Sequence, residues 1–523
     1  MLETSRVGAD PHVLEGARAA LLEAECIELR ARVDVRDQRI RVLEEALRVL
    51  KANKYGPSRE RLSVAAGQSE LFNEIEATLE LSEVVGTEPE LTATPLRETK
   101  PSKGRPGRAR LAAHLLRVEI RHELPEAERA CRCGGTLLEI GADISEQIDY
   151  VPAQVQVLRH VRVKYACPGC EQCVKSAPVP EHILPKTNAS PGLLAHLVTA
   201  KYIDSLPLYR LEKMFERDQV RLPRATQAAW MIGLHLPLQP LLNLMDERLR
   251  SSGYVRIDET RVQVLHSDKA PSALHWMWVR VAGPKQQRII LFDYDPGRGG
   301  AVADTLIEGC TGYLQSDGYA AYEGTSARAH LIHVGCFAHA RRRFFEALKA
   351  LPDAQSKRAS AAHEGVQRID ALYLIEREIK ALDDAERTRV RRERAVPQLQ
   401  SLHAWASQLQ HETMPSGKLG DALGYLLKQW PKLVRYVEDP RLAMDTNLAE
   451  NAIRPFALGR RNWLFADTVK GAKASAALYS IVSTARANGL EPTAYLRRLF
   501  TELPKAKTVE DIEALLPFAT APN

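Results

Sequence analysis

The sequence has no long apolar segment. None of its hydrophobic runs approaches the roughly 18 residues that a membrane-spanning helix needs, and the first 30 residues carry several charges where a signal peptide would have an apolar core. A large excess of one charge is also missing, because 72 Lys and Arg face 66 Asp and Glu, for a net charge of +6. We therefore expect a soluble, cytoplasmic protein that uses no membrane, and its mildly basic balance is compatible with a nucleic acid partner.

Glycine and proline are absent from Ala17 to Ala52, within a heptad repeat that covers residues 15–52. Both seam positions are apolar apart from one Arg36: Leu22, Leu29, Leu43 and Leu50 at one position, and Cys26, Val33, Ile40 and Leu47 at the other. Mostly β-branched residues at position a with leucine at d favour a parallel two-stranded coiled coil. We predict that residues 1–52 form a dimerisation helix. The alternative is an amphipathic helix that packs on its own protein.

Cysteine is scarce and unevenly spread. Five of the 8 cysteines lie between residues 131 and 173, in a C-x-C pair, a C-x-x-C pair and one further residue: Cys131, Cys133, Cys167, Cys170 and Cys173. In a cytosolic chain, two turns with paired thiolates suit a structural zinc site with four cysteine ligands better than disulfides. We predict a zinc-binding domain over 109–187, held by the two pairs. Cys173 could replace one ligand, and reduced cysteines without metal are the alternative.

Two further segments before residue 251 have basic candidates for DNA contact. Residues 53–108 are predicted to hold a short helix and then a linker, whose basic end at 103–108 resembles the core of an AT-hook around Arg105; a solvated basic linker is the alternative. Residues 188–250 are predicted to be helical, with helices Leu208–Arg217 and Arg224–Leu236 around a turn, the layout of a helix-turn-helix with Arg224 beside the turn. A plain helical bundle fits this second pattern equally well.

From residue 251 the pattern changes to strands, and two of them end at an acid. A short strand Tyr254–Ile257 leads to Asp258, and after further strands at 274–281 and 288–293 and a helix at 301–309, a strand at 311–315 leads to Asp317. The order β-β-β-α-β is typical of a ribonuclease-H-like domain. In such a sheet the first and fourth strands lie side by side, so we expect Asp258 and Asp317 to face each other.

A third acid stands in the stretch from Met444 to Phe465. Asp445, Thr446 and Asn447 are typical helix-start residues, and Glu450 follows one turn later with polar neighbours on its face. Pro455 should kink or end this helix. Alone, the stretch could be an amphipathic surface helix with a solvated polar face.

Three carboxylates on separate elements are suited to phosphodiester chemistry. Two Mg²⁺ ions, roughly 4 Å apart, activate the attacking oxygen and stabilise the leaving one, and Mg²⁺ prefers oxygen ligands. We interpret Asp445 as helix-start chemistry and Asp293 and Asp295 as turn residues at a strand end. Because neighbouring residues of a strand point to opposite faces, Glu259 cannot face the site together with Asp258.

Several motifs together resemble the insertion-sequence-66 family of DDE transposases. They follow in the family's order along almost the whole chain: YGPSRERL at 55–62, the CGG and CPGC turns, IDET at 257–260, SDGYAAY at 316–322, GCFAHARRRF at 335–344, TNLAENAIRP at 446–455 and GRRNWLF at 459–465. The resemblance implies that Asp258, Asp317 and Glu450 are the catalytic triad, holding two Mg²⁺ or Mn²⁺ ions. It also implies double-stranded DNA as partner, in the form of terminal inverted repeats and target DNA, at least a homodimer, small accessory proteins and a place at the nucleoid.

Asp317 and Glu450 are 133 positions apart, which is too far for an uninterrupted domain. We predict a multidomain α/β plus α protein whose catalytic domain (251–340 and 441–485) is interrupted by an all-helical insertion at 341–440 and followed by a helical tail at 486–523. Cys336-x-x-His339, at the entrance of the insertion, supplies only two ligands, so a structural or DNA-contacting role is favoured over metal. The insertion's arginine run at 387–394 is either a DNA contact or a solvated face.

The predicted function is DNA transposition by strand cleavage and 3′-hydroxyl strand transfer. Four arginines near the third acid and the insertion are candidate DNA contacts: Arg341, Arg454, Arg460 and Arg461. The alternatives are a domesticated, non-catalytic DNA-binding regulator, which would not need the three acids, and a nuclease for RNA–DNA hybrids, which would leave the N-terminal modules unexplained.

Overall fold

The computed structural model describes residues 11–55, 119, 154–166, 174–352 and 357–518, with side chains at 27–51, 119, 154–165, 176–352 and 357–518. The chain divides into two compact units, one of residues 1–86 with 162–523 and one of residues 87–161. The second unit has few described residues, so the fold below is that of the first. The predicted zinc ligands Cys131, Cys133, Cys167 and Cys170, the spare Cys173 and the linker's Arg105 lie outside the described residues.

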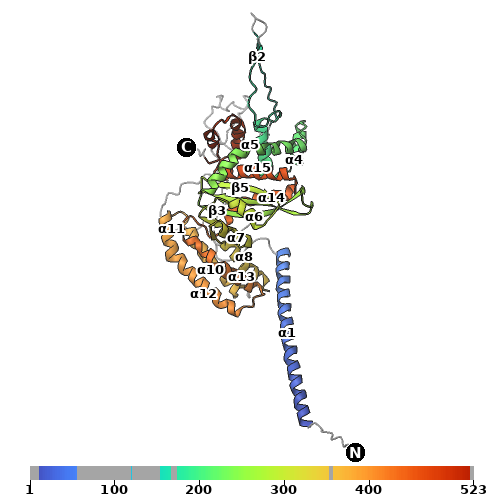
Figure 1. Ribbon diagram of the computed structural model, residues 1–523, viewed down its shortest axis with the longest axis vertical. Coiled ribbons are helices and arrows are strands. Elements are labelled where there is room, and N and C mark those ends of the chain that lie inside the picture. The colour runs from blue at the N-terminus through green and yellow to red at the C-terminus, as the bar shows by residue number, and fades with distance from the viewer. Residues whose placement is uncertain (1–10, 56–118, 120–153, 167–173, 353–356, 519–523) are drawn as a thin grey trace, which may run out of the picture. The chain divides into compact units, whose positions relative to one another are not determined.

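A mixed sheet forms the centre of the first unit (Figure 1). Its strands are β3 (Tyr254–His266), β4 (Leu274–Ala282), β5 (Ile289–Asp295), β6 (Tyr313–Gln315) and β7 (Ile332–Val334), in the order β5-β4-β3-β6-β7. The first three are antiparallel, whereas β6 and β7 run parallel to β3. The helices α6 (Gly300–Ile307) and α7 (Ala320–Arg328) follow β5 and β6. The elements thus occur in the predicted β-β-β-α-β order.

Strand β3 is longer than predicted. It continues through Asp258 to His266, because its second half pairs with β4 and its end pairs with β8 (Ala466–Thr468). The short-strand interpretation was wrong because the mixed polar and apolar residues after Asp258 hide this pairing. The acid therefore lies inside a paired strand, which makes it more rigid than a loop position.

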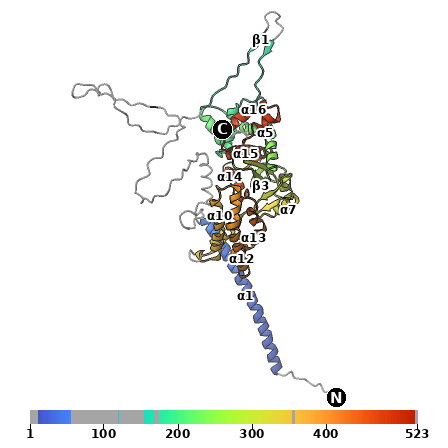
Figure 2. The ribbon, with the colours of Figure 1, turned by 90° about the vertical axis from the view of Figure 1, so that its left-hand side faces the viewer.

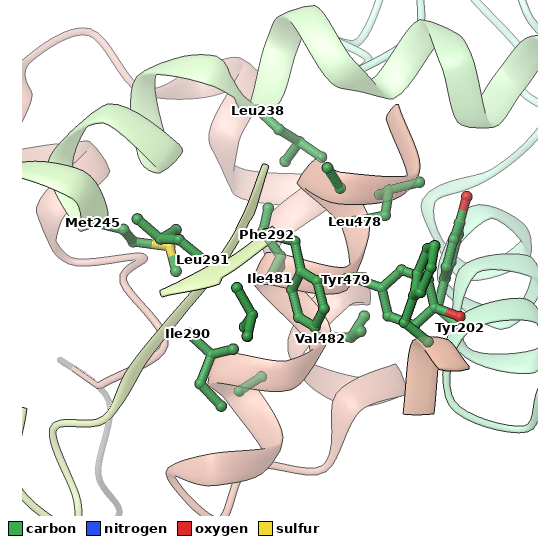
Figure 3. Close-up of a cluster of buried hydrophobic side chains, with 14 of the residues drawn as sticks. Tyr202, Leu238, Met245, Ile290, Leu291, Phe292, Leu478, Tyr479, Ile481 and Val482 are labelled. Atoms are coloured by element: carbon green, nitrogen blue, oxygen red, sulfur yellow. The ribbon is translucent and has the colours of Figure 1, made fainter. Parts of the chain in front are cut away.

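Two long helices cover one side of the sheet, α5 (Arg224–Arg250) and α15 (Val469–Ala487), with a dense apolar cluster between them and β5 (Figure 3). Helix α15 also closes the sheet's edge, because the Ser480 and Thr484 hydroxyls accept hydrogen bonds from the backbone N–H groups of Phe292 and Ile290 at 2.7 and 3.0 Å. An uncovered edge strand would offer these groups to another chain.

The predicted helix-turn-helix segment is helical, with one correction to its bounds. Helices α3 (Pro191–Tyr202) and α4 (Leu208–Arg217) precede α5, which begins at Arg224 as predicted but continues past Leu236 to Arg250, through Pro237 and Pro240. Four fully buried side chains explain the extension: Leu238, Leu241, Met245 and Leu249. Their packing outweighs the helix-breaking tendency of proline.

A second core lies within the helical segment between β7 and α14 (Asn447–Trp463). It is built from α8 (Phe337–Ala350), α10 (Ala361–Glu378), α11 (Asp384–Val390), a π-helical turn at Arg391–Ala395, α12 (Val396–Glu412), α13 (Lys418–Leu433) and a 3₁₀ turn at Val434–Val437. Figures 1 and 2 show α10, α12 and α13 packed together in both views. The C-terminal part consists of α16 (Pro492–Glu502), a 3₁₀ turn at Leu503–Lys505 and α17 (Val509–Glu513), and a two-stranded sheet joins β1 (Lys164–Ala166) to β2 (Val174–Ser176).

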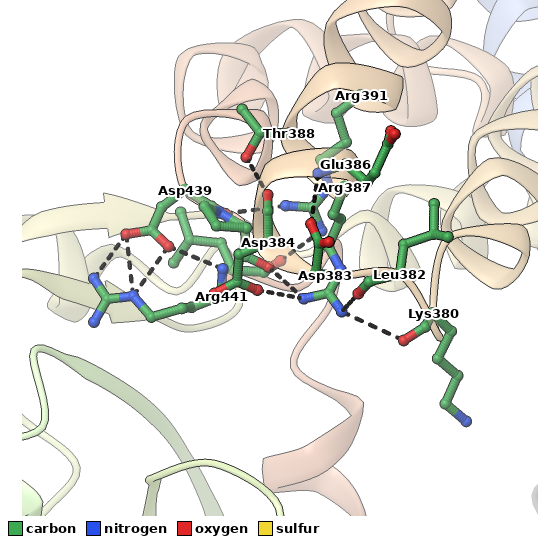
Figure 4. A network of polar contacts seen from close by, with 12 residues as sticks. Lys380, Leu382, Asp383, Asp384, Glu386, Arg387, Thr388, Arg391, Asp439 and Arg441 are labelled. Atoms are coloured by element: carbon green, nitrogen blue, oxygen red, sulfur yellow. Dashed lines mark hydrogen bonds and ion pairs between the residues drawn. The ribbon is translucent and has the colours of Figure 1, made fainter.

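The basic run at 387–394 is divided: Arg389, Arg392 and Arg394 are exposed, whereas Arg387 and Arg391 bind other parts of the chain. Arg391 is 2% exposed; it pairs with Glu376 at 2.6 Å and donates to the carbonyl groups of Tyr436, Asp439 and Leu442. Arg387 donates to three further carbonyl groups and to Asp384 in the same network (Figure 4). These two arginines join the insertion to the segment before α14, a role that only distant carbonyl groups reveal.

Helix α1 (Pro11–Tyr55) contains the predicted heptad repeat. Its described apolar seam residues, from Leu29 to Leu50, are between 49% and 66% exposed. Contact with the rest of the chain is made beside the seam, where Arg48 Nε donates to the Ala350 carbonyl at 2.7 Å and Glu45 accepts from the Lys418 N–H at 3.1 Å. Self-association stays a prediction, and the exposed seam leaves room for a partner.

Candidate active site

The two strand acids lie side by side. Strands β3 and β6 are parallel and pair Val255 with Leu314 and Arg256 with Gln315. Continuing this register by two residues brings Asp258 level with Asp317. Asp317 lies just after β6, where its Oδ1 accepts the Tyr319 N–H at 2.9 Å. The sheet therefore brings these two carboxylates together from positions 59 residues apart in the sequence.

Glu450 reaches the same place from the first turn of α14. Burial, reinforced by the charges of Glu450, Glu259 and Asp317, raises the pKa of Asp258 to about 8. The carboxylate of Glu450 lies 3.9 Å from Arg342 and 3.7 Å from His339, both on α8, and accepts a hydrogen bond from Thr446 at 3.4 Å. Glu450 and Asp317 thus both lie near enough to Asp258 to raise its pKa, although the three acids come from a strand, a turn and a helix.

Other acids near this site have partners of their own. Glu259 is bound by Arg298 at 2.7 Å and by the Tyr322 hydroxyl. Asp445 accepts the Asn447 N–H at 3.1 Å, the helix-start role that was predicted, and also the hydroxyl of Tyr373. Both carboxylates are therefore bound by other groups of the chain.

The prediction for two strand acids was half right. Asp295 accepts the Gly297 N–H at 2.6 Å and is the expected turn residue. Asp293 is not a turn residue, because it lies inside β5 and pairs with the buried Arg280 at 3.0 Å. Arg280 also binds Asp246 of α5 at 2.6 Å, so this cluster fastens α5 to the sheet.

The donor set of the three acids suits a hard divalent cation. Each of Asp258, Asp317 and Glu450 offers only oxygen, and gathering three carboxylates around a buried position is unfavourable unless protons or cations reduce the charge. The raised pKa of Asp258 expresses this repulsion together with burial. A cation at this point would supply the positive charge that the neighbouring Arg342 provides only in part.

A neighbour of Asp317 that the sequence analysis missed is Tyr425 of α13. Gly318 has no side chain, and a Cβ atom there would lie 2.8 Å from the Tyr425 ring and hydroxyl. The helical segment thus contacts the backbone directly after Asp317. The glycine following the acid was the only sequence signal for this contact.

Helix α14 continues through Pro455 to Trp463, so of the two predicted effects of this proline, a kink or an end, the end is excluded. Among the candidate DNA contacts, Arg461 is exposed, Arg460 donates to the Arg261 carbonyl and Arg454 is half-buried. Arg461, near the end of the helix that carries Glu450, is therefore accessible to solvent.

Two further arginine candidates differ in environment. Arg224 is exposed at the start of α5. Arg341 is 9% exposed and forms a two-point pair with Asp370, with Nε at 2.7 Å and Nη2 at 3.3 Å. A guanidinium buried in this way holds α8 to α10 and is not presented to a DNA backbone.

Cys336 and His339 lie against the start of α14. The Cys336 sulfur is buried and accepts hydrogen bonds from the Thr446 N–H at 3.4 Å and from its hydroxyl at 3.3 Å. Burial, together with the charges of Asp445 and Glu450, raises the pKa of the Cys336 thiol to about 12. This cysteine therefore anchors the residue that directly precedes α14, the helix that carries Glu450.

Comparison with known proteins places this chain in a family. The family model "Transposase IS66 family" matches residues 186–474, more than half of the chain, and includes all three acids. The curated relatives include the uncharacterized protein y4qI of Sinorhizobium fredii, 31% identical over 97% of this chain and 94% of its own length. The chain belongs to the IS66 transposase family.

Other family models match the remaining parts of this IS66 chain. They are the zinc-finger binding domain of transposase IS66 at 128–171, the IS66 C-terminal element at 480–518 and Transposase C of IS166 homeodomain at 42–120. The first includes the four predicted zinc ligands, whereas Cys173 lies beyond it. A second relative, the uncharacterized protein y4jD of the same organism, is 30% identical over 80% of this chain and 83% of its own length.

Membership supports a transposase with DNA as partner, a structural zinc and a divalent metal. Among the described parts of the chain, no helix is both long and apolar enough to cross a bilayer.

Proposed function

We propose that this protein is the DDE transposase of an insertion sequence, which cuts DNA at the element ends and joins the freed 3′-hydroxyl to target DNA. The observation that carries the proposal is the convergence of Asp258, Asp317 and Glu450, expressed in the raised pKa of Asp258. Family membership supports the same chemistry.

The sheet supports a ribonuclease-H-like catalytic domain. Its order β5-β4-β3-β6-β7, with three antiparallel strands followed by two parallel ones, is the arrangement we expect of that fold. The helical segment from α8 to α13 has a core of its own and separates β7 from α14, as an insertion would. Tyr425 and Arg342 are the residues by which this insertion would support the site.

The three acids would hold two Mg²⁺ or Mn²⁺ ions, which would activate the attacking oxygen and stabilise the charge on the leaving oxygen. The chain's own contribution is position: Asp258 is fixed within a paired strand, Asp317 by its turn, and Glu450 by the Thr446 hydroxyl. Arg342, beside Glu450, would contact the phosphate approaching the acids. Arg454, Arg460 and Arg461 on the same helix as Glu450 are candidate contacts to the flanking backbone.

DNA recognition and assembly belong to the other modules in this proposal. The segment at Arg224, the basic linker around Arg105 and the zinc domain with Cys131, Cys133, Cys167 and Cys170 would bind the terminal repeats. The exposed seam of α1 would join at least two copies. Small accessory proteins of the same element and association with the nucleoid complete the proposal.

The test is Mg²⁺-dependent nicking of a labelled duplex that carries an element end. We expect Asp317→Asn to abolish nicking while DNA binding stays intact, since the acid is needed for metal and not for fold. Asp304→Asn on α6 is the matched control, because that carboxylate is paired with Arg328 at 2.8 Å, away from the acids. Unchanged nicking by Asp317→Asn would sink the assignment. DNA binding without nicking in the wild type would favour the regulator.

A further inference from the structure

Three side chains of different chemistry meet beside the proposed Mg²⁺ site. The Cys336 sulfur, a His339 ring nitrogen and a Glu450 carboxylate oxygen all lie within 4.8 Å of one another. Cys336 directly precedes α8 and His339 follows within its first turn, so they share one side of the helix. The motif alone supplies two ligands, which is too few for a metal. The fold adds the third from α14.

The ligand atoms are already oriented toward each other. His339 Nδ1 is buried and has no hydrogen-bond partner among the described residues, with a Glu450 carboxylate oxygen at 3.7 Å. No hydrogen bond within the described part of the chain therefore occupies this nitrogen, and it is available as a ligand. The Cys336 sulfur is held by two hydrogen bonds from Thr446, the kind of support that fixes a metal-bound thiolate.

The spacing is close to that of a tetrahedral zinc site. With bonds of about 2.3 Å to sulfur and about 2.0 Å to nitrogen, two such ligands stand about 3.5 Å apart. The cluster would therefore contract by roughly 1 Å, within reach of side-chain rotation. Three protein ligands leave a fourth position for water, as in open zinc sites.

We propose that Cys336, His339 and Glu450 form a binding site for a thiophilic divalent cation such as Zn²⁺. On binding, the S–H bond of Cys336 breaks, a sulfur–metal bond forms and the proton passes to solvent. Sulfur and imidazole nitrogen select Zn²⁺ over Mg²⁺, which prefers oxygen alone. Arg342 approaches the other Glu450 oxygen, Oε2, at 3.9 Å, whereas Oε1 faces His339.

Such a site would also control the reaction, a consequence that depends on the proposed function. In the structure one carboxylate oxygen of Glu450 lies within 4.8 Å of the Cys336 sulfur and of a His339 nitrogen, so a Zn²⁺ bound there would compete with the proposed Mg²⁺ for this carboxylate. A bound Zn²⁺ would therefore withdraw the third acid and switch off Mg²⁺-dependent cutting. The activity of the enzyme would depend on which of the two cations is bound by the Glu450 carboxylate.

Metal binding is tested on the full chain with Co²⁺, whose thiolate charge-transfer band and intense tetrahedral d–d bands report such a site optically. Protein with its zinc-finger domain loaded with zinc is titrated with Co²⁺. We expect one equivalent to produce these bands in the wild type and in Cys310→Ser, a matched control at the other buried cysteine that the structure describes. The charge-transfer band should vanish in Cys336→Ser.

His339→Asn is a second test in case Cys336→Ser does not fold. This substitution should disturb the fold less, because the His339 side chain is 27% exposed whereas Cys336 is buried. We expect it to weaken Co²⁺ binding at least about tenfold, as loss of one ligand should. No band in the wild type, or an unchanged band in both variants, would overturn the proposal.

The regulatory half is measured by nicking at fixed Mg²⁺ with added Zn²⁺. We expect Zn²⁺ to inhibit the wild type at least about tenfold and extra Mg²⁺ to reverse this inhibition, because the two cations compete for Glu450. His339→Asn should resist Zn²⁺, since it has lost one ligand of the inhibitory site. Equal Zn²⁺ inhibition of the wild type and of His339→Asn would refute the regulatory role of this zinc site. If the wild type never nicks, the proposed function fails, while the Co²⁺ titration still decides the metal site.

Discussion

The most informative perturbation is Asp258→Asn, because it should stabilise the protein while removing its activity. In the fold without Mg²⁺, burial and three neighbouring carboxylates raise the pKa of Asp258 from 3.8 to about 8. Between these values the folded protein keeps a proton that the unfolded chain releases. Stability therefore falls as the pH rises above 3.8, and the loss is complete above about pH 8. Asparagine has no such proton to hold.

The size of the effect follows from the same shift. Each pKa unit corresponds to about 1.4 kcal/mol. At pH 7 the free energy of unfolding of the wild type is therefore lower by up to about 4 kcal/mol than that of a protein with a neutral side chain at this position. This is an upper limit, because water and neighbouring side chains can rearrange around the charge. The advantage of Asp258→Asn should shrink by about 1.4 kcal/mol for each pH unit on the way down to about pH 5.

Hydrogen exchange of β3 and β4 peptides, measured by mass spectrometry in buffer without Mg²⁺, gives the local opening free energy. Rates are corrected for the pH dependence of intrinsic exchange. We expect Asp258→Asn to slow exchange strongly at about pH 7 and weakly at about pH 5, and Asp304→Asn to change neither. If Asp258→Asn has the same local opening free energy as the wild type, or exceeds it by the same amount at both pH values, the electrostatic explanation is refuted. Nicking by the variant would refute the catalytic role.

Three further predictions test other parts of the fold. Arg391→Met should destabilise the helical segment by about 3–5 kcal/mol, because Glu376 is left without its buried partner; thermal unfolding measures this against Arg392→Met, an exposed control. Leu43→Asp should lower the mass found by light scattering, because it puts charge in the α1 seam, whereas Val35→Asp, exposed but off the seam, should leave it unchanged. Thr484→Val should cost about 1–3 kcal/mol by removing a hydrogen bond at the β5 edge, measured by urea denaturation.

Local patterns in the sequence were sufficient where a property depends on neighbouring residues. The heptad repeat predicted a helix that is present from Pro11 to Tyr55, and the alternation and turn signals placed the strands in the right order. The three acids were predicted as candidates because phosphodiester chemistry needs oxygen ligands from separate elements. Their convergence required one further assumption, the side-by-side pairing of the first and fourth strands, which the β3–β6 register supplies.

The sequence failed where the decisive partner is distant along the chain. Nothing near Arg391 shows that its guanidinium binds carbonyl groups about 50 residues away, and nothing near Pro237 shows that buried leucines carry α5 through it. Local preference favours solvation or a helix end at these positions. Burial of apolar surface and satisfaction of buried polar groups outweigh that preference, and both exist only in the folded chain.

By itself, the sequence determined the types of element, the candidate acids and the family to which the motifs point. Only the tertiary structure decided which charged groups meet: Arg341 is turned inward to Asp370, and Cys336 and His339 are joined by Glu450. The physical reason is the sequence separation over which each kind of interaction acts. Periodicity and capping act over a few residues, whereas a site is made by contacts between strands and helices that the sequence keeps more than 100 residues apart.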